Sequence, residues 1–168
     1  MFKKLLWVFF ISMVPIIELR GSIPVGCGLG LDAIPNLICA MLGNLLPVPF
    51  ILLFIPQILN FMEKHRIFPR IVGWVQRKAH RGVEKMSASA EEKGDDQHRI
   101  PWGALIALFA FVAVPLPGTG AWTGSLIAAT FGMKKRYSIP VIILGVLVAG
   151  ILVTLISYGA LSALEFLL

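Results

Sequence analysis

Charged residues are scarce in this sequence, and long stretches contain none. Only 14% of the 168 residues are charged, whereas an average soluble domain has about 25%. Hydrophobic residues make up 57% of the chain, and uncharged runs dominate both of its ends. This composition excludes an ordinary soluble domain and predicts an all-α integral membrane protein.

Cysteine and histidine are also few and are badly placed for metal chemistry. Cys27 and Cys39 both lie in apolar surroundings, and His65, His80 and His98 are spread along a polar stretch. No metal-ligand spacing is present, and no nucleophile lies beside a general base. We therefore expect no metal, no cofactor and no enzymatic activity.

The positive net charge of +6 does not indicate nucleic-acid binding. The basic residues lie beside apolar segments, and no groove-reading or base-stacking module is recognisable. This distribution favours contact with a membrane surface. We expect membrane lipids as partners and no nucleic acid.

The stretch Val14–Gly26 places a carboxylate and a guanidinium inside an apolar run. Glu18 and Arg20 are two residues apart, and Gly21 and Pro24 follow at once. Ionisable groups at membrane depth are costly, so they are usually paired, face a cavity and mark a transport route. We expect Gly21 and Pro24 to break the helix here, where the backbone must be buried or line water.

The apolar run before this break is short. Residues 5–17 cover about 20 Å, which is less than a hydrocarbon core of about 30 Å. We predict a re-entrant hairpin over residues 5–31, with its tip at residues 18–24. The alternative is one continuous, kinked spanning helix over the same residues.

A similar stretch occurs in the second half of the chain. Val114–Gly124 also begins with Val-Pro and places glycines inside an apolar segment. It predicts a second re-entrant hairpin over residues 101–133. The expected breaks here are Pro115, Pro117, Gly118 and Gly120.

Each hairpin precedes a segment that is long enough to span a membrane. We predict these spans at residues 33–59 and 139–168. The first span contains Asn44 followed by Pro47 and Pro49. These residues indicate either a packing kink or a kink that lines a cavity, because proline frees backbone carbonyls one turn earlier.

The predicted fold consists of two units, residues 1–59 and 101–168, and each crosses the membrane once. The second unit is then inverted relative to the first, which is the pattern of inverted-repeat transporters. Twelve of the fifteen lysines and arginines lie in residues 60–100 and 134–136. The positive-inside rule puts these segments on the cytoplasmic side of the cell membrane and both termini outside. Lys3 and Lys4 argue for the alternative, an N-terminus inside.

Residues 60–100 form the only polar stretch. Apolar residues from Phe68 to Met86 recur on one helical face, which predicts an amphipathic helix on the membrane surface. The alternative is a helix packed on a partner protein. The expected anionic-lipid surface is Arg66, Arg70, Arg77, Arg81 and Lys85.

The two interrupted motifs together resemble the putative small multidrug export protein family, which is related to the DedA/VTT membrane protein superfamily. The motifs are P-I-I-E-L-R-G-S-I-P at residues 15–24 and V-P-L-P-G-T-G-A-W-T-G-S-L-I-A-A at residues 114–129. The resemblance covers nearly the whole chain. It implies a DedA-like fold with two opposed re-entrant hairpins, and either drug export or translocation of a polyprenyl-phosphate lipid. DedA proteins typically bring an arginine with the second hairpin, whereas here Arg20 is the only cation at this depth.

The chemistry of the two breaks suits transport. A carboxyl group in apolar surroundings is a natural carrier of a coupling proton, and a guanidinium can hold a carboxylate or phosphate. Hydroxyl groups and an indole add to these charges. The expected substrate and ion pathway is Glu18, Arg20, Ser22, Asn44, Thr119, Trp122 and Thr123. The alternative is that Glu18 and Arg20 are structural and only link the hairpins.

Two functional classes follow from these features. The first is a secondary transporter, coupled to protons or cations and expected to be a dimer, with a small amphipathic compound or a lipid phosphate as substrate. The second is a membrane scaffold that binds anionic lipid and transports nothing.

Overall fold

The computed structural model describes residues 1–65, 102–116 and 118–167, and these residues form helices and no strands. The prediction of an all-helical chain is therefore confirmed for them. The predicted amphipathic helix, with its anionic-lipid surface, lies outside the described residues. The helices are α1 (Phe2–Met13), α2 (Glu18–Gly28), α3 (Ala33–Leu45), α4 (Pro47–Lys64), α6 (Trp102–Ala113), α7 (Ala121–Thr130) and α8 (Lys135–Leu167).

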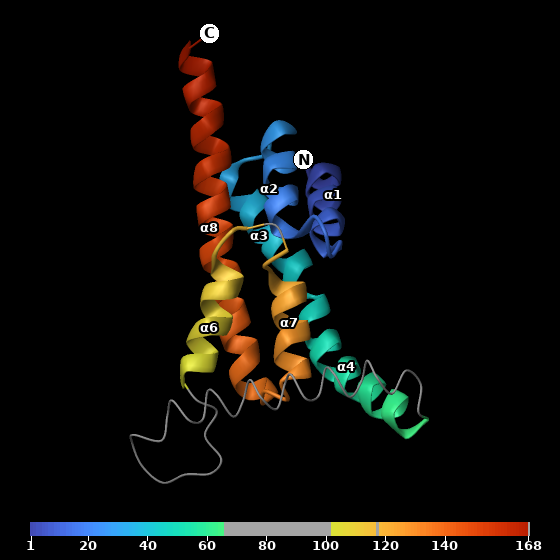
Figure 1. Ribbon diagram of the computed structural model, residues 1–168. Helices are drawn as coiled ribbons and strands as arrows, with labels where there is room; N and C mark the ends of the chain where they lie inside the picture. The colour runs from blue at the N-terminus through green and yellow to red at the C-terminus, as the bar shows by residue number, and fades with distance from the viewer. Residues whose placement is uncertain (66–101, 117, 168) are drawn as a thin grey trace.

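Two helical hairpins point toward each other from opposite ends of the molecule (Figure 1). The first consists of α1 and α2, and the second of α6 and α7. Their connections lie side by side near mid-height, where the tip of each hairpin meets the other. The site described below is built from these two tips.

A Val-Pro pair ends the first arm of each hairpin. Val14 has extended backbone angles, with φ −73° and ψ 127°, as expected of a residue before proline. Pro15 lacks an N–H group and cannot continue the helix, so α1 ends at Met13. Pro115 stands in the same relation to α6, which ends at Ala113.

The predicted position of the first break is wrong. The turn lies at residues 14–17, whereas Gly21 and Pro24 lie inside α2, which runs from Glu18 to Gly28. The physical reason is that Pro15 already stops the helix. Pro24 removes a backbone hydrogen bond and crowds the carbonyl one turn earlier, but α2 packs on α1, α3 and α8 and continues through it.

The long helices contain two candidate membrane spans, Ala33–Leu59 and Lys135–Ala160. The first joins α3 to α4 through Leu46, which has helical backbone angles. Pro47 is the first residue of α4, a position where the missing N–H group has little effect. The second starts with α8 at Lys135, four residues before the predicted start of the span at residue 139.

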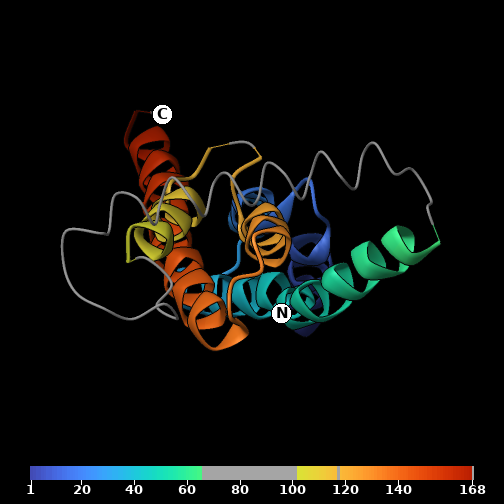
Figure 2. The same cartoon turned by 60° about the horizontal axis from the view of Figure 1, so that its bottom comes forward.

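Each hairpin packs against both long helical segments. The first arms lie on the span of their own half, α1 on α3 and α6 on α8. The second arms pack on both spans: α2 lies on α8 and on α3, and α7 lies mainly on α4 and also on α8. Figure 2 shows α7 between α8 and α4, and the end of α4 extending away from the other helices.

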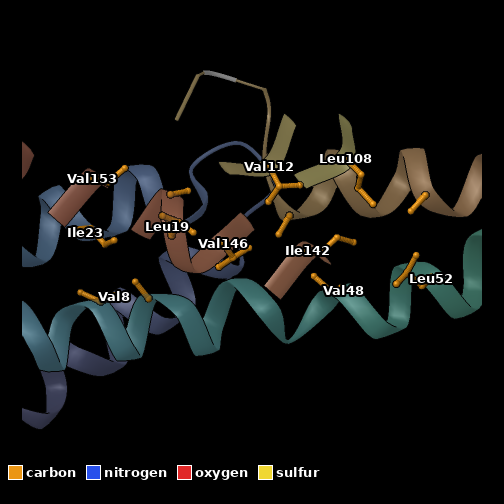
Figure 3. Packing of buried hydrophobic residues seen from close by; sticks show 14 of the residues in the cluster. Val8, Leu19, Ile23, Val48, Leu52, Leu108, Val112, Ile142, Val146 and Val153 are labelled. Carbon is orange, nitrogen blue, oxygen red and sulfur yellow. The ribbon is translucent and has the colours of Figure 1, made fainter. Parts of the chain in front are cut away.

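The apolar core lies where these helices meet (Figure 3). Leu19 and Ile23 of α2, Val112 of α6, and Ile142 and Val146 of α8 belong to one cluster of buried side chains. All five side chains are almost fully buried. The core therefore joins residues from both halves of the chain.

The buried residues of the two spans occupy corresponding positions, at a constant separation along the chain. In α3, Asn36, Ala40, Gly43 and Asn44 are buried. In α8, Ser138, Ile142, Gly145 and Val146 are buried, each 102 positions later in the chain (for the glycines, 145 minus 43). The two glycines have matching contacts, because a Cβ at Gly43 would strike the carbonyl oxygen of Phe9, and one at Gly145 would lie 3.3 Å from that of Phe109.

Candidate functional site

Glu18 is the first residue of α2 and lies at the tip of the first hairpin. Its side chain is only 5% exposed, and its backbone φ is +50°, in the left-handed region. A residue with a Cβ adopts this conformation at a cost of order 1–3 kcal/mol, and it persists only where surrounding contacts enforce it. The backbone is thus held so that the carboxylate points at the second hairpin.

The Glu18 carboxylate sits at the N-terminal end of α7. Its Oε1 accepts a hydrogen bond of 3.2 Å from the backbone N–H of Trp122, the second residue of that helix. The first N–H groups of a helix have no partner within the helix and carry a partial positive charge. The position therefore stabilises a carboxylate.

Gly120 makes this approach possible. It is the residue before α7, and a Cβ built there would overlap the Glu18 carboxylate, with Oε1 only 2.6 Å away. Its backbone is extended, at φ −163°, which any residue can adopt. Glycine is needed at this position for space rather than for its conformational freedom.

Arg20 binds the other arm of the second hairpin, at the C-terminal end of α6. Its guanidinium donates to the carbonyl oxygens of Val112 at 3.3 Å and Val114 at 3.0 Å, and also to that of Leu116. These carbonyls lie at and just beyond the C-terminal end of α6, where a helix favours a cation. Glu18 and Arg20 thus have separate partners, and both partners belong to the second hairpin.

Trp122 belongs to the second hairpin, and its side chain bonds to the first. Its indole Nε1 donates to the carbonyl oxygen of Met13, the last residue of α1, at 3.1 Å. The two N–H groups of Trp122 therefore hold both ends of the turn at residues 14–17. We refer to Glu18, Arg20 and Trp122, with the backbone groups that they bind, as the hairpin clasp.

Thr119 belongs to the same cluster. Its hydroxyl lies 2.8 Å from the carbonyl oxygen of Val114 and 3.0 Å from that of Leu116, two of the three carbonyls that Arg20 binds. Thr123 is half-buried and directly follows Trp122. Pro115, Gly118 and Gly120 lie in the connection between α6 and α7, whereas Pro117 lies outside the described residues.

Ser22 and Asn44 are fully buried, and neither is part of the hairpin clasp. The Ser22 hydroxyl and both amide atoms of Asn44 have no hydrogen-bond partner within the described part of the chain. Ser22 lies one turn after Glu18 in α2, and Asn44 lies near the end of α3. A buried, unpaired polar group is expensive, so these two side chains are notable in an apolar core.

The sequence analysis missed a second polar contact, between α2, α3 and α8. The buried amide of Asn36 donates to the carbonyl oxygen of Ile23 at 2.8 Å and to the hydroxyl of Tyr158 at 3.0 Å. That hydroxyl donates in turn to the carbonyl oxygen of Leu31 at 2.6 Å. Asn36 is a polar residue within an apolar segment, as Asn44 is, and this signal was available in the sequence.

The apolar spans and the helical hairpins define the class, an all-helical membrane protein. Within that class, the chain belongs to the family described as putative small multi-drug export protein, whose profile matches residues 18–152. The match begins at Glu18 and covers the three side chains of the hairpin clasp and most of both spans. Searches of curated proteins and of solved structures found no match to this chain.

Proposed function

We propose that the protein is a secondary transporter of the cell membrane that exports small amphipathic compounds, coupled to protons or cations. The family description supports the export role. In this proposal residues 60–100 lie on the cytoplasmic side, as the distribution of lysine and arginine favours. We also propose a dimer as the working unit.

The architecture that fits this function is a pair of inverted repeats with re-entrant hairpins. The 102-residue register between the spans supports it, as does the reciprocal packing of α2 on α8 and α7 on α4. The second arms match as well, because Gly21-Ser22 of α2 corresponds to Gly124-Ser125 of α7, and both serines are fully buried. Inverted-repeat transporters place their substrate site where the two repeats meet.

The hairpin clasp is then the barrier between the two sides of the membrane. If neither hairpin crosses the membrane, the route from each side ends at a hairpin tip. A substrate can pass only when the tips separate, which requires the bonds made by Glu18, Arg20 and Trp122 to break. The nearby Ser22, Asn44 and Thr123 add polar groups to the proposed pathway.

The observation that carries the proposal is the position of Glu18. A carboxyl group that is 5% exposed, held in a strained backbone conformation and bound to the opposite hairpin, is placed to link proton binding to hairpin separation. Protonation would remove the charge that the N-terminal end of α7 stabilises. Strained residues of this kind cluster at functional sites.

The alternatives have less support. Translocation of a polyprenyl-phosphate lipid calls for cations at the hairpin tips, whereas Arg20 binds backbone carbonyls in this structure and the second hairpin has no lysine or arginine of its own. A scaffold role depends on the basic residues of segment 66–101, outside the described residues. Deleting the basic charges of that segment should leave transport largely intact if the transporter proposal is correct.

The substitution Glu18→Gln tests the proposal. The amide keeps an oxygen for the Trp122 N–H but cannot release a proton, so we expect proton-driven transport in proteoliposomes to be abolished. The melting temperature in detergent should fall only slightly, because the amide keeps the bond from Trp122 but loses the charge that α7 stabilises. Substrate exchange without a proton gradient should survive. Loss of stability in parallel with loss of transport would show instead that Glu18 only links the hairpins.

A further inference from the structure

The C-terminal end of α6 presents carbonyl oxygens that the helix itself cannot satisfy. In a continuing helix, Val112 would accept a hydrogen bond from the N–H of Leu116. That N–H instead bonds the carbonyl oxygen of Val114, at 2.9 Å. Pro115 has no N–H to offer, so the end of α6 needs donors from elsewhere.

A guanidinium supplies these donors. Arg20 reaches across from the first hairpin and donates to Val112, Val114 and Leu116. The arrangement shows which chemistry the carbonyl cluster accepts, namely a planar cation with several N–H groups. The Arg20 Nε is buried and has no partner in the described structure, so the guanidinium is held only through its two terminal nitrogens.

Separation of the hairpins would withdraw this guanidinium. The Val112 carbonyl would then be unpaired at membrane depth, where an unsatisfied backbone group costs several kcal/mol. The carbonyls of Val114 and Leu116 would keep the bonds donated by Leu116 and Thr119 but lose their cationic partner. An incoming molecule with N–H donors and a positive charge would replace what Arg20 provides. The Glu18 carboxylate, on the same hairpin tip, supplies a negative charge nearby.

We propose that the carbonyl cluster of Val112, Val114 and Leu116 binds the head group of the transported compound, and that Arg20 occupies this site in the resting state. The ligand class is an amphipathic cation with N–H donors, an alkylguanidinium or a primary alkylammonium. A quaternary ammonium lacks donors and is excluded. This inference rests on the proposed transport function, since it identifies the substrate class of the same site.

Chemical rescue of Arg20→Ala tests the site without measuring transport. The variant should melt at a lower temperature than the wild type, and millimolar methylguanidinium should restore part of the loss in a saturable way. Methylammonium should act more weakly, and tetramethylammonium and sodium chloride not at all. Equal effects of methylguanidinium and tetramethylammonium, or the absence of any effect on a folded variant, would overturn the site.

Binding to the wild-type protein gives a second measurement, which does not depend on the variant folding. Labelled octylguanidinium should bind the reconstituted wild type and be displaced by methylguanidinium about tenfold more effectively than by tetramethylammonium. Absence of binding, or equal displacement by both cations, contradicts the proposal. If rescue and binding succeed but proton-driven export of octylguanidinium does not occur, the site stands and the transport function fails.

Discussion

At the scale of the residue, the hairpin clasp is a set of side chains that form hydrogen bonds with backbone groups of the opposite hairpin. Arg20 binds the C-terminal end of α6 in the second hairpin, and Trp122 binds the C-terminal end of α1 in the first. Glu18 binds the N-terminal end of α7 in the second hairpin. Non-helical backbone at membrane depth must be satisfied within the protein, and these three residues do so.

Gly120→Ala tests how closely the Glu18 carboxylate must approach α7. The added methyl group would overlap the carboxylate, so we expect a loss of about 1–3 kcal/mol in the free energy of unfolding. Proton-driven transport should fall as well, because Glu18 is displaced from the Trp122 N–H. The measurement is a denaturant or thermal unfolding curve, taken beside a proteoliposome flux assay.

Gly103→Ala is the matched control for this substitution. Gly103 lies near the start of α6, and a Cβ there meets nothing within 4 Å. Its replacement should leave stability and flux unchanged or slightly improved, since alanine favours a helix. Equal behaviour of the two variants would show that the contact between Gly120 and Glu18 is unimportant.

The charged members of the clasp were predictable from the sequence, but their partners were not. Glu18 and Arg20 are conspicuous because they are ionisable residues within an apolar run. Their partners are backbone groups near residues 112–122, about a hundred positions away, and every residue has such groups. Only the fold determines which of them are unpaired and within reach.

At the scale of the element, the position of each hairpin turn depends on one Val-Pro pair. The sequence analysis expected Gly21 and Pro24 to break the first hairpin, but the turn forms at residues 14–17. Gly21 and Pro24 do not end α2, because the packing of this helix on α1, α3 and α8 outweighs their cost. The restriction that Pro15 and Pro115 place on the preceding valines acts locally, and it was present in the sequence.

Gly43→Ala tests the packing of α1 against its own span. A Cβ at residue 43 would strike the backbone carbonyl of Phe9, which cannot move without shifting α1. We expect a loss of about 1–3 kcal/mol in stability, which outweighs the gain in helix propensity of up to about 1 kcal/mol. Unfolding curves of the purified variant in detergent give this value.

The control for this packing test is Gly159→Ala in α8, where an added Cβ meets nothing within 4 Å. Only the gain in helix propensity applies at this residue, so its stability should be equal or higher. If Gly43→Ala were as stable as this control, the close approach of α1 to α3 would not contribute to the fold.

At the scale of the whole molecule, the main regularity is the correspondence between the two halves. The sequence shows it only in the Val-Pro pairs and the glycines. The structure adds a burial register, in which residues as different as Asn36 and Ser138 occupy matching buried positions. Packing conserves the pattern of contacts better than the identity of the side chains, so sequence comparison between the halves finds little.

The architecture also explains why two short hairpins and two long spans make a stable unit. Each second arm packs on the span of the other half as well as on its own, so the two halves share one core. The buried residues of both halves form one cluster. Movement of one hairpin relative to the other would therefore act directly on the clasp at its centre.

The central claim is that the hairpins enter the membrane from opposite sides and meet at the clasp. Cysteine labelling in sealed inside-out vesicles tests it, with Cys27 and Cys39 replaced by alanine. Single cysteines are placed at Lys3, Asp32 and Lys135, which are exposed and lie at the N-terminal ends of α1, α3 and α8. A variant with a cysteine at Ser89 is the reference for the side that the proposed topology makes cytoplasmic.

The account predicts that Lys135→Cys and Ser89→Cys react with an impermeant maleimide in intact inside-out vesicles. Lys3→Cys and Asp32→Cys should react only after the vesicles are permeabilised, because α1 and α2 leave the membrane on the side where they entered it. Labelling of Lys3→Cys and Asp32→Cys from opposite faces would contradict the account, since residues 5–31 would then cross the membrane.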